Sequence, residues 1–217
     1  MLIELNLHGK QVMIIGAGNE ALKRIKSLEK QGCKILVISD RISKQINNLA
    51  RSKKIKLKKQ KIENAQFLLK HKPYIVITTT DDKKLNKIIM DAAKKRGIIA
   101  YSSDNPDESD FANPAIIDFE NTVQIAIFTG GKSPAMSKKI KTKSEALLRK
   151  IITKKDIDHI KLQKIARSMA QENISTQSER KRYLLSIMTD KGIDQLIKDG
   201  QLKKAERRAV TILRNWG

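Results

Sequence analysis

The chain of 217 residues has one cysteine, four prolines and only 4% aromatic residues. Cys33 can form no disulfide within the chain and no cysteine-rich metal site, which fits a reducing compartment such as the cytoplasm. No apolar run approaches the roughly 18 to 20 residues that a membrane-spanning helix needs, so we expect no transmembrane segment. The opening MLIELNLHGK lacks a long apolar stretch, which argues against a secretory signal. The three histidines are isolated from one another, and we therefore expect no protein metal site.

Positive charge is in large excess, with 45 Lys and Arg against 23 Asp and Glu and a formal net charge of +22. The two halves of the chain share this excess evenly. It favours attraction to polyanions, such as nucleic acid, an anionic membrane surface or a ligand with many carboxylates. The densest basic stretch, Arg51–Lys61, contains no aromatic residue for base stacking. We interpret it as a solvated lysine-rich face and expect no nucleic-acid partner.

Short apolar strands alternate with helical patterns over the first hundred residues. Apolar residues at helical spacing follow the first, second and fourth of these strands. Nearly all-apolar strands that alternate with helices predict a parallel sheet covered on both faces. With right-handed crossovers, the predicted fold class is α/β, a Rossmann-like doubly wound parallel sheet. The strands are expected at 11–15, 34–38, around 55–57, at 74–78 and at 98–101.

The pattern changes after Asp104. A polar connection, NPDESDFANP, precedes one further strand at 123–128. From Ser133 onward only helical spacing is found, over segments 134–152, 156–172, 178–189 and 201–214. The predicted regions are a dinucleotide-binding domain at 1–113, a small mixed region at 114–150 and an α-helical C-terminal domain at 151–217.

A G-x-G-x-x-A motif lies between the first strand and the first helix. The first glycine permits a tight turn, the second lets the backbone approach a pyrophosphate, and the alanine lets helix and strand pack closely. Free N–H groups at the helix start hold the anion, helped by the helix dipole. The alternative is a glycine turn with only a structural role. The motif consists of Gly16, Ala17, Gly18, Asn19, Glu20 and Ala21.

The second predicted strand is followed by Asp40 and Arg41. A carboxylate at this place accepts hydrogen bonds from the adenosine ribose and repels a 2′-phosphate, which favours NAD over NADP. Arg41 weakens the discrimination, because a guanidinium accommodates that phosphate.

Two polar loops follow the fourth and fifth predicted strands, at the sheet edge where open α/β sheets bind ligands. The first contains Thr79, Thr80 and Asp81, which we expect to line the cofactor cleft. A plain helix cap is the alternative for this loop. In the second loop, Asp104 is expected near the nicotinamide, where a carboxylate can accept a substrate proton while hydride leaves to the cofactor. The alternative is a turn residue that bonds its own backbone.

A fourth motif, T-G-G-K-S-P, follows the strand expected at 123–128. Paired glycines before a helix can form an anion-binding nest, and a lysine adds positive charge. The serine is a good N-cap and the proline suits the first helical position, so a well-capped helix is the alternative. The candidate anion-binding residues are Gly130, Gly131, Lys132 and Ser133.

Taken in order, these four motifs resemble the NAD-dependent precorrin-2 dehydrogenases of siroheme synthesis, which include the N-terminal module of siroheme synthase. The resemblance runs from about residue 2 to residue 150 and more loosely beyond. The chain departs from the family pattern at Ala17, at Glu20 and at Tyr101-Ser102-Ser103. The family's G-G-G-x-V-A falls on 16–21, its T-D-D-x-x-x-N on 80–86, its N-V-V-D-x-P on 101–106 and its S-G-G-x-S-P on 129–134.

The resemblance implies oxidation of precorrin-2 to sirohydrochlorin with NAD, and some members of the family also insert iron. It implies that Asp104 is the catalytic carboxylate. Ser133 corresponds to a serine near the tetrapyrrole cleft that is phosphorylated in some members. The residues implied to contact NAD are Asn19, Glu20, Asp40 and Arg41.

The resemblance also implies a homodimer that forms through the central region, 114–150. Its substrate and product are anionic tetrapyrroles, which the positive charge of the chain would attract. Two other functions compete with this interpretation. A nucleotide-sensing regulatory module explains the glycine turn and Asp40, but it does not explain Asp104 or the T-G-G-K-S-P motif. A basic nucleic-acid-binding protein explains the charge, but the chain lacks a recognised binding motif.

Overall fold

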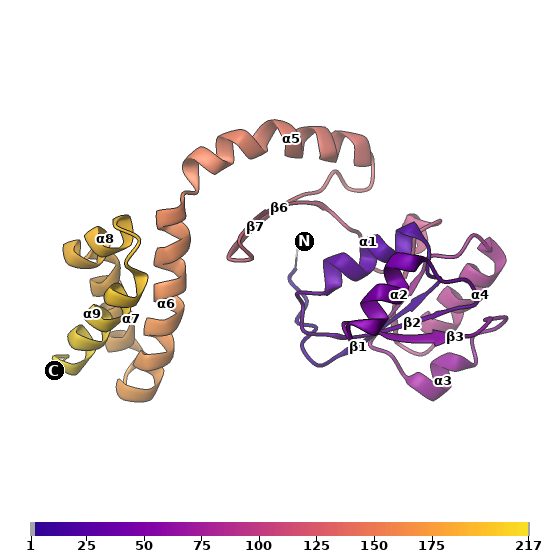
Figure 1. The fold of residues 1–217 in the computed structure, drawn as a ribbon, viewed down its shortest axis with the longest axis horizontal. Helices are drawn as coiled ribbons and strands as arrows, with labels where there is room; N and C mark the ends of the chain where they lie inside the picture. Colours follow the sequence, from indigo (N-terminus) through magenta and orange to yellow (C-terminus); the bar gives the residue numbers. More distant parts are fainter. Residues whose placement is uncertain (1–2, 217) are drawn as a thin grey trace. The chain divides into compact units, whose positions relative to one another are not determined.

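The computed structural model describes residues 3–216. The chain divides into two units, Met1–Asn113 and Pro114–Gly217, whose helices and strands are labelled in Figure 1. Each unit has its own hydrophobic core. Among the described residues, no helix has the length and apolar character needed to cross a membrane.

A parallel sheet forms the centre of the first unit. Its strands are β1 (Gln11–Ile15), β2 (Lys34–Ser39), β3 (Lys56–Lys59), β4 (Ile75–Thr78) and β5 (Ile99–Ser102). The strand order is β3-β2-β1-β4-β5. This is the order of a doubly wound sheet. The chain adds β2 and β3 on one side of β1 and then β4 and β5 on the other side. A crevice forms at the carboxyl edge where the order switches. Ile15 at the end of β1 pairs with Ile38 of β2 and with Thr78 of β4, so the loops after these strands meet at that edge.

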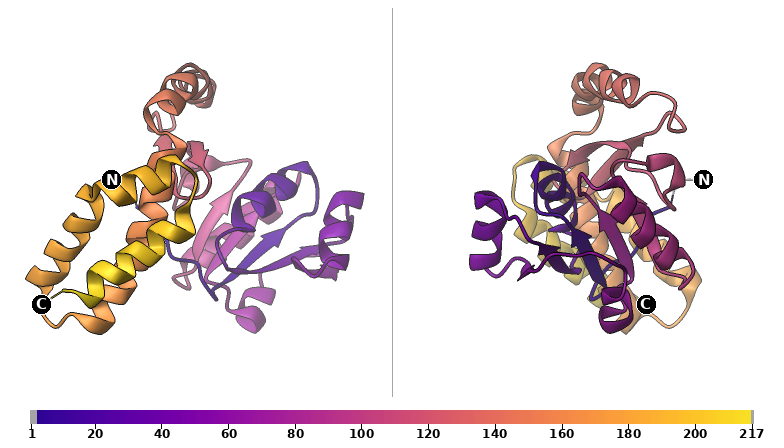
Figure 2. Two further views of the ribbon diagram at one scale, coloured as in Figure 1. Left: turned by 60° about the vertical axis from the view of Figure 1, so that its left-hand side comes forward. Right: turned by 90° about the vertical axis from the view of Figure 1, so that its right-hand side faces the viewer.

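Helices cover both faces of this sheet (Figure 2). They are α1 (Asn19–Leu28), α2 (Lys44–Arg51), α3 (Phe67–His71) and α4 (Lys83–Lys94), with the short 3-10 helix η1 (Pro106–Glu108) after β5. Val12 and Ile14 of β1 pack with α1 and α2, whereas Met13 and Ile15 pack with α3 and α4. Successive side chains of a strand point to opposite faces, so one apolar strand supplies both cores. The predicted doubly wound α/β fold is confirmed.

The basic stretch forms the edge strand β3. Lys56, Lys58 and Lys59 are exposed, while Leu57 is half-buried against the sheet. Lysines on an edge strand hinder pairing with the edge of another sheet.

The second unit begins with an antiparallel hairpin and continues as helices. Its elements are β6 (Ala115–Phe119), β7 (Val123–Ile127), α5 (Pro134–Ile151), α6 (Lys154–Asn173), α7 (Gln177–Thr189), α8 (Lys191–Lys198) and α9 (Leu202–Arg214). Glu120 and Asn121 in the hairpin turn both have positive φ, as a type I′ turn requires. Ile117 and Phe119 of the hairpin pack with Ile157 of α6 in a small core.

Helices α6 to α9 share a second core around Tyr183. This side chain is fully buried, and its hydroxyl donates to the carbonyl of Ala209 over 3.0 Å. Its ring meets Trp216 edge to face at 5.4 Å. A buried tyrosine whose hydroxyl has an acceptor contributes its apolar area without leaving a polar atom unpaired.

Three elements differ from the sequence prediction, which gave one strand between residues 114 and 133 and no helix at 67–71 or 191–198. Strand β6 has five residues and follows two prolines, so the alternation in it is too short to be recognised. Helix α3 also has only five residues. Helix α8 starts directly after α7 because Asp190 ends one helix and caps the next. A cap between two helices leaves no loop signal in the sequence.

Candidate functional site

The turn after β1 depends on Gly16. Its φ is +104°, which L side chains rarely adopt, and a Cβ there would lie 2.6 Å from Oγ1 of Thr79. That hydroxyl itself donates to the carbonyl of Ile15 over 2.9 Å. At Gly18, by contrast, an added Cβ would meet nothing within 4 Å. The second glycine therefore faces open space, as the approach of a pyrophosphate requires.

The N-terminus of α1 is open to an anion. Gly18 is its N-cap, and no side chain caps this helix. The first N–H groups are then free to bind a phosphate, and the helix dipole favours negative charge there. The backbone of the turn and the uncapped helix end therefore fit the pyrophosphate of a dinucleotide.

Glu20 lies in the first turn of α1 and is neutralised by two cations. It forms ion pairs with Lys23 at 3.0 Å and with Arg24. Partial burial acts to raise the pKa of Glu20, but the contacts with Lys23 and Arg24 outweigh burial and hold it below its usual value. Arg24 also bonds the hydroxyl of Tyr101 and lies over its ring. The acid near the phosphate position is thus compensated locally.

A pocket of about 790 Å³ lies at the carboxyl edge of β1, β2 and β4. We call it the glycine-turn pocket. All ten residues that the sequence predicted to bind the cofactor line it, although these residues are far apart in the chain. They are Gly16, Ala17, Gly18, Asn19, Glu20, Asp40, Arg41, Thr79, Thr80 and Asp81.

Asp40 and Arg41 form the end of the pocket that follows β2. The carboxylate of Asp40 accepts the N–H of Arg41 over 2.9 Å, and both side chains are exposed. The neighbouring Ser39 hydroxyl donates to the carbonyl of Arg41 over 2.7 Å. These bonds hold the turn in which a ribose hydroxyl would meet the carboxylate.

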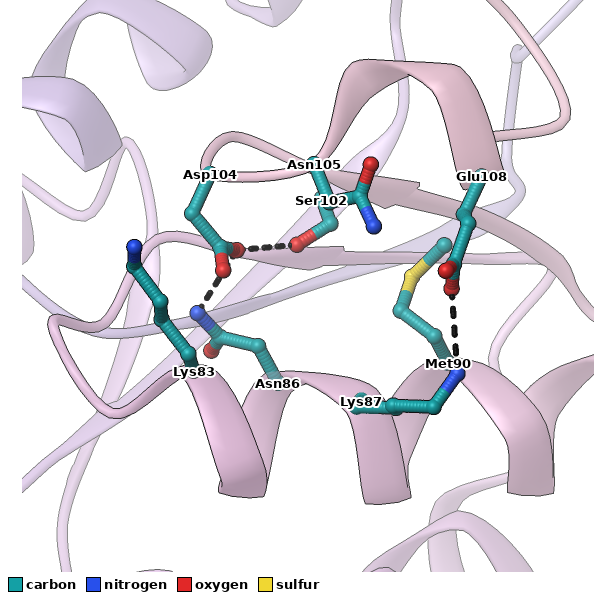
Figure 3. Close-up of a pocket in the computed structure, with 8 residues that line it drawn as sticks. All are labelled: Lys83, Asn86, Lys87, Met90, Ser102, Asp104, Asn105 and Glu108. Carbon is teal, nitrogen blue, oxygen red and sulfur yellow. Dashed lines mark hydrogen bonds and ion pairs between the residues drawn. The ribbon is translucent and has the colours of Figure 1, made fainter.

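A second pocket, of about 280 Å³, contains Asp104 and lies between the end of β5 and the first half of α4. We call it the Asp104 pocket. Figure 3 shows its eight lining residues, with the Asp104 carboxylate directed toward Asn86 and Ser102. Lys83 and Lys87 line the side formed by α4, and Glu108 of η1 forms an ion pair with Lys87 at 3.3 Å.

Asn86 connects the two pockets. Its amide nitrogen donates to Oδ1 of Asp104 over 2.8 Å and to the carbonyl of Thr80 over 2.9 Å. Its amide oxygen accepts the hydroxyl of Thr80 over 2.6 Å. Because Thr80 lines the glycine-turn pocket, one side chain separates that pocket from the carboxylate of Asp104. In the loop between them, Asp82 caps α4 by accepting the N–H of Leu85 over 2.9 Å.

The loop with Gly130, Gly131, Lys132 and Ser133 belongs to the second unit and lies between β7 and α5. Both glycines have positive φ, at +65° and +77°. Ser133 caps α5 by accepting the N–H of Met136 over 3.2 Å, and Pro134 occupies the first turn. The capping expected from the sequence is confirmed, while anion binding stays a prediction.

The described part of the chain holds no group of three or more His, Cys, Asp or Glu residues arranged to bind a metal.

Asn86 and Ser102 are the residues to which the sequence analysis gave no role. Asn86 is 1% exposed and lies on the apolar face of α4 with Ile89, Met90 and Ala93. A buried asparagine at a core position of an amphipathic helix is costly unless it is hydrogen-bonded. This polar break in an apolar stripe was the signal available in the sequence.

Residues 3–115, just over half of the chain, match the model of the family described as "Putative NAD(P)-binding". The chain therefore belongs to this family. The match confirms the prediction of NAD as the cofactor, whose pyrophosphate the open helix end and glycine turn fit.

Curated relatives of the chain include siroheme synthases. The one from Actinobacillus pleuropneumoniae is 25% identical over 216 residues, which are 98% of this chain and 42% of the relative. "Siroheme synthase 1" of Aeromonas salmonicida is 31% identical over 142 residues, which are 65% of this chain and 30% of the relative. The chain thus spans less than half the length of these curated relatives.

The solved structure of "SirC, precorrin-2 dehydrogenase" is similar over nearly the whole chain. The TM-score is 0.71 at 20% identity, and the match covers 97% of this chain and 99% of that chain. Together with the siroheme synthases, it confirms the resemblance to the precorrin-2 dehydrogenase family that the four motifs predicted.

Proposed function

We propose that this protein oxidises precorrin-2 to sirohydrochlorin with NAD⁺. The observation that carries the proposal is the connection through Asn86, which joins the glycine-turn pocket to a pocket containing the exposed carboxylate of Asp104. A regulatory module that only senses a nucleotide has no use for a second pocket with a positioned acid–base group. The curated relatives and the solved structure support the same activity.

The oxidation removes two electrons and two hydrogens from the macrocycle. Bound NAD⁺ supplies the acceptor for the hydride. Asp104 accepts the accompanying proton, because its carboxylate is exposed at the pocket and has one oxygen, Oδ2, without a hydrogen bond in the described residues. The glycine turn and α1 hold the pyrophosphate, and Thr79, Thr80 and Asp81 line the cleft between it and Asp104.

The cofactor is expected to be NAD rather than NADP. Asp40 presents a carboxylate where the adenosine ribose would lie, and a 2′-phosphate would be repelled there. Arg41 beside it reduces the preference, because a guanidinium accommodates a 2′-phosphate. The backbone N–H of Arg41 bonds the Asp40 carboxylate and holds it in place.

The macrocycle carries many carboxylates, and cations are available to bind them. Lys83 is exposed at the mouth of the Asp104 pocket and forms no ion pair within the described residues. The loop of Gly130, Gly131, Lys132 and Ser133 on the other unit offers a further anion-binding group. We propose a role in substrate binding for each of these groups separately.

The second unit also suits dimerisation. Met136, Ile140, Leu147 and Ile151 fall within one narrow stripe of α5, and each is at least 38% exposed. We propose that 114–150 is the dimerisation region of a homodimer and that 151–217 is a separate helical domain. With its single cysteine, we place the enzyme in the reducing cytoplasm.

The direct test is to incubate the protein with precorrin-2 and NAD⁺ and to follow NADH and the sirohydrochlorin spectrum. We expect both to appear together in equal amounts. Asp104→Asn is expected to lose at least about a hundredfold in turnover, in the range of general acid–base catalysis, while it binds NAD⁺ as tightly as the unchanged protein. An undiminished rate in this variant removes Asp104 from the mechanism, and no product with the unchanged protein rejects the proposed activity.

Adding Fe²⁺ or Co²⁺ to the same assay shows whether sirohydrochlorin is also the substrate of metal insertion, through the appearance of a metallated spectrum. A parallel titration with duplex and single-stranded DNA tests the nucleic-acid alternative. Tight binding with a steep dependence on salt would favour that alternative.

A further inference from the structure

We propose that Ser102 and Asn86 are positioning residues that hold Asp104 with one oxygen fixed and the other directed to the substrate. The proposal rests on the proposed role of Asp104 as the proton acceptor. Neither residue contacts the reacting atoms, and both would act only through the carboxylate of Asp104.

The hydrogen bonds at Asp104 all end on one oxygen. Oδ1 accepts the hydroxyl of Ser102 over 2.5 Å and the amide of Asn86 over 2.8 Å. A carboxylate oxygen has two lone pairs, so these donors occupy both. Oδ2 is left as the accepting atom.

The direction of the bond from Ser102 is fixed by its other neighbour. Its hydroxyl lies 2.8 Å from the hydroxyl of Thr78, and both side chains are buried, at 2% and 0% exposure. A hydroxyl has one proton, and the carboxylate of Asp104 can only accept. Ser102 therefore donates to Asp104 and accepts from Thr78, which forms a directed chain from the sheet to the carboxylate.

The orientation of Asn86 is fixed as well. The carbonyl of Thr80 can only accept, so the amide nitrogen of Asn86 must face it, and the same nitrogen faces Asp104. The hydroxyl of Thr80 donates to the amide oxygen. If the amide were rotated by half a turn, its oxygen would face two other acceptors, the carbonyl of Thr80 and the carboxylate of Asp104.

These bonds restrict the exposed carboxylate of Asp104 to one orientation. Asp104 follows a strand end and would otherwise be a mobile surface side chain. Bonds from two buried donors hold it in one rotamer and leave Oδ2 as the accepting atom. The remaining charged groups that line this pocket are Lys83 and Lys87 of α4 and Glu108 of η1.

The test compares Ser102→Ala and Asn86→Asp with Ser109→Ala. Ser102→Ala removes one donor with little change of shape, and Asn86→Asp replaces the amide by a carboxylate of equal size. Ser109→Ala is the matched control, because this hydroxyl accepts the backbone N–H of Ser102 over 2.9 Å but does not contact Asp104. Lys83, Lys87 and Glu108 stay unchanged in every variant.

We expect kcat to fall about 10- to 100-fold in Ser102→Ala and Asn86→Asp, with the KM for NAD⁺ unchanged. Ser109→Ala is expected to keep both kcat and KM. A fall in kcat accompanied by a similar rise in the KM for NAD⁺ would show a merely structural role and overturn the proposal.

A second measurement does not depend on turnover. Asp104 is followed by ¹³C NMR in protein labelled at the aspartate carboxyl, with Asp104→Asn to assign its signal. The carboxyl chemical shift of Asp104 at neutral pH is expected to change in Ser102→Ala and in Asn86→Asp, because each variant loses a hydrogen bond to Oδ1, but not in Ser109→Ala. An unchanged chemical shift overturns the positioning role, whereas a changed shift in a protein without dehydrogenase activity supports it and rejects only the proposed reaction.

Discussion

At the scale of single residues, the site depends on side chains from loops that are distant in the chain. All ten candidate cofactor-binding residues line one pocket. Asn86 bonds Thr80 and Asp104, which lie 6 and 18 positions away on different loops. Contacts of this kind depend on which strands are neighbours in the sheet.

Gly16→Ala is predicted to remove dinucleotide binding. The new Cβ would have to overlap Thr79 at a φ of +104°, so we expect a loss of about 3 kcal/mol in the free energy of unfolding of the first unit. Urea unfolding and calorimetric titration with NAD⁺ measure the two effects. Gly97→Ala is the control: its φ is +66°, nothing lies within 4 Å, and about 1 kcal/mol of strain should leave NAD⁺ affinity unchanged. Equal NAD⁺ affinities in the two variants would contradict the prediction.

Lys83→Ala is predicted to raise the KM for precorrin-2 several-fold with little change in kcat, because it removes an attraction that is equal in the ground state and the transition state. The neighbouring Lys84→Ala removes the same charge from an exposed residue that does not line the Asp104 pocket. Steady-state kinetics at low salt should separate the two variants. Equal effects would mean that only the overall charge matters.

At the scale of elements, the N-termini of the helices contribute to stability and to ligand binding. Helices α4 to α7 each begin with a side-chain cap, from Asp82, Ser133, Thr153 and Thr176, and Asp190 does the same for α8. Helices α1, α2, α3 and α9 have none. An uncapped N-terminus costs stability unless a ligand or water satisfies its N–H groups. In α1 the uncapped end lines the glycine-turn pocket, where a bound anion can satisfy these groups.

Asp190 is predicted to make the helical group of the second unit sensitive to acid. Its carboxylate binds the N–H of Ile193 and two nitrogens of Arg208, at 2.6 and 2.8 Å, and the contact with Arg208 holds the pKa of Asp190 below its usual value. A lowered pKa in the folded state stabilises the protein above the unfolded value of about 3.9. That stability is lost as the pH falls through the lower folded value.

Trp216 is the only tryptophan and packs on Tyr183, so its fluorescence reports on this helical group. Between about pH 5 and pH 2, the free energy of unfolding should fall less steeply in Asp190→Asn than in the unchanged protein. Asn keeps the helix cap, so the difference isolates the charge. Asp199→Asn, which changes a carboxylate without a cation partner in the described residues, should follow the unchanged protein. Identical slopes in all three proteins would refute the prediction.

At the scale of the whole molecule, the α5 stripe should decide the oligomeric state. Leu147 and Ile151 are more than 60% exposed, and a charge among them would be desolvated if a second copy covered the stripe. We predict that the unchanged protein elutes with twice the mass of the chain in light-scattering chromatography and that Leu147→Glu elutes as a monomer. Lys138→Glu, on the opposite face of α5, should stay dimeric. A monomeric unchanged protein would end the dimer proposal.

Local patterns in the chain were enough to predict the α/β sheet, the glycine turn and the two strand-end loops, because period-two spacing, helical spacing and glycine chemistry are local properties. They also predicted most of the C-terminal helices. The folded structure settled the strand order β3-β2-β1-β4-β5, which places the predicted loops after β1, β2 and β4 side by side around one pocket. It also decided that Asn86 contacts Asp104. The reason is that strand order and burial are set by packing between distant segments, and one chain's pattern does not encode which segments meet.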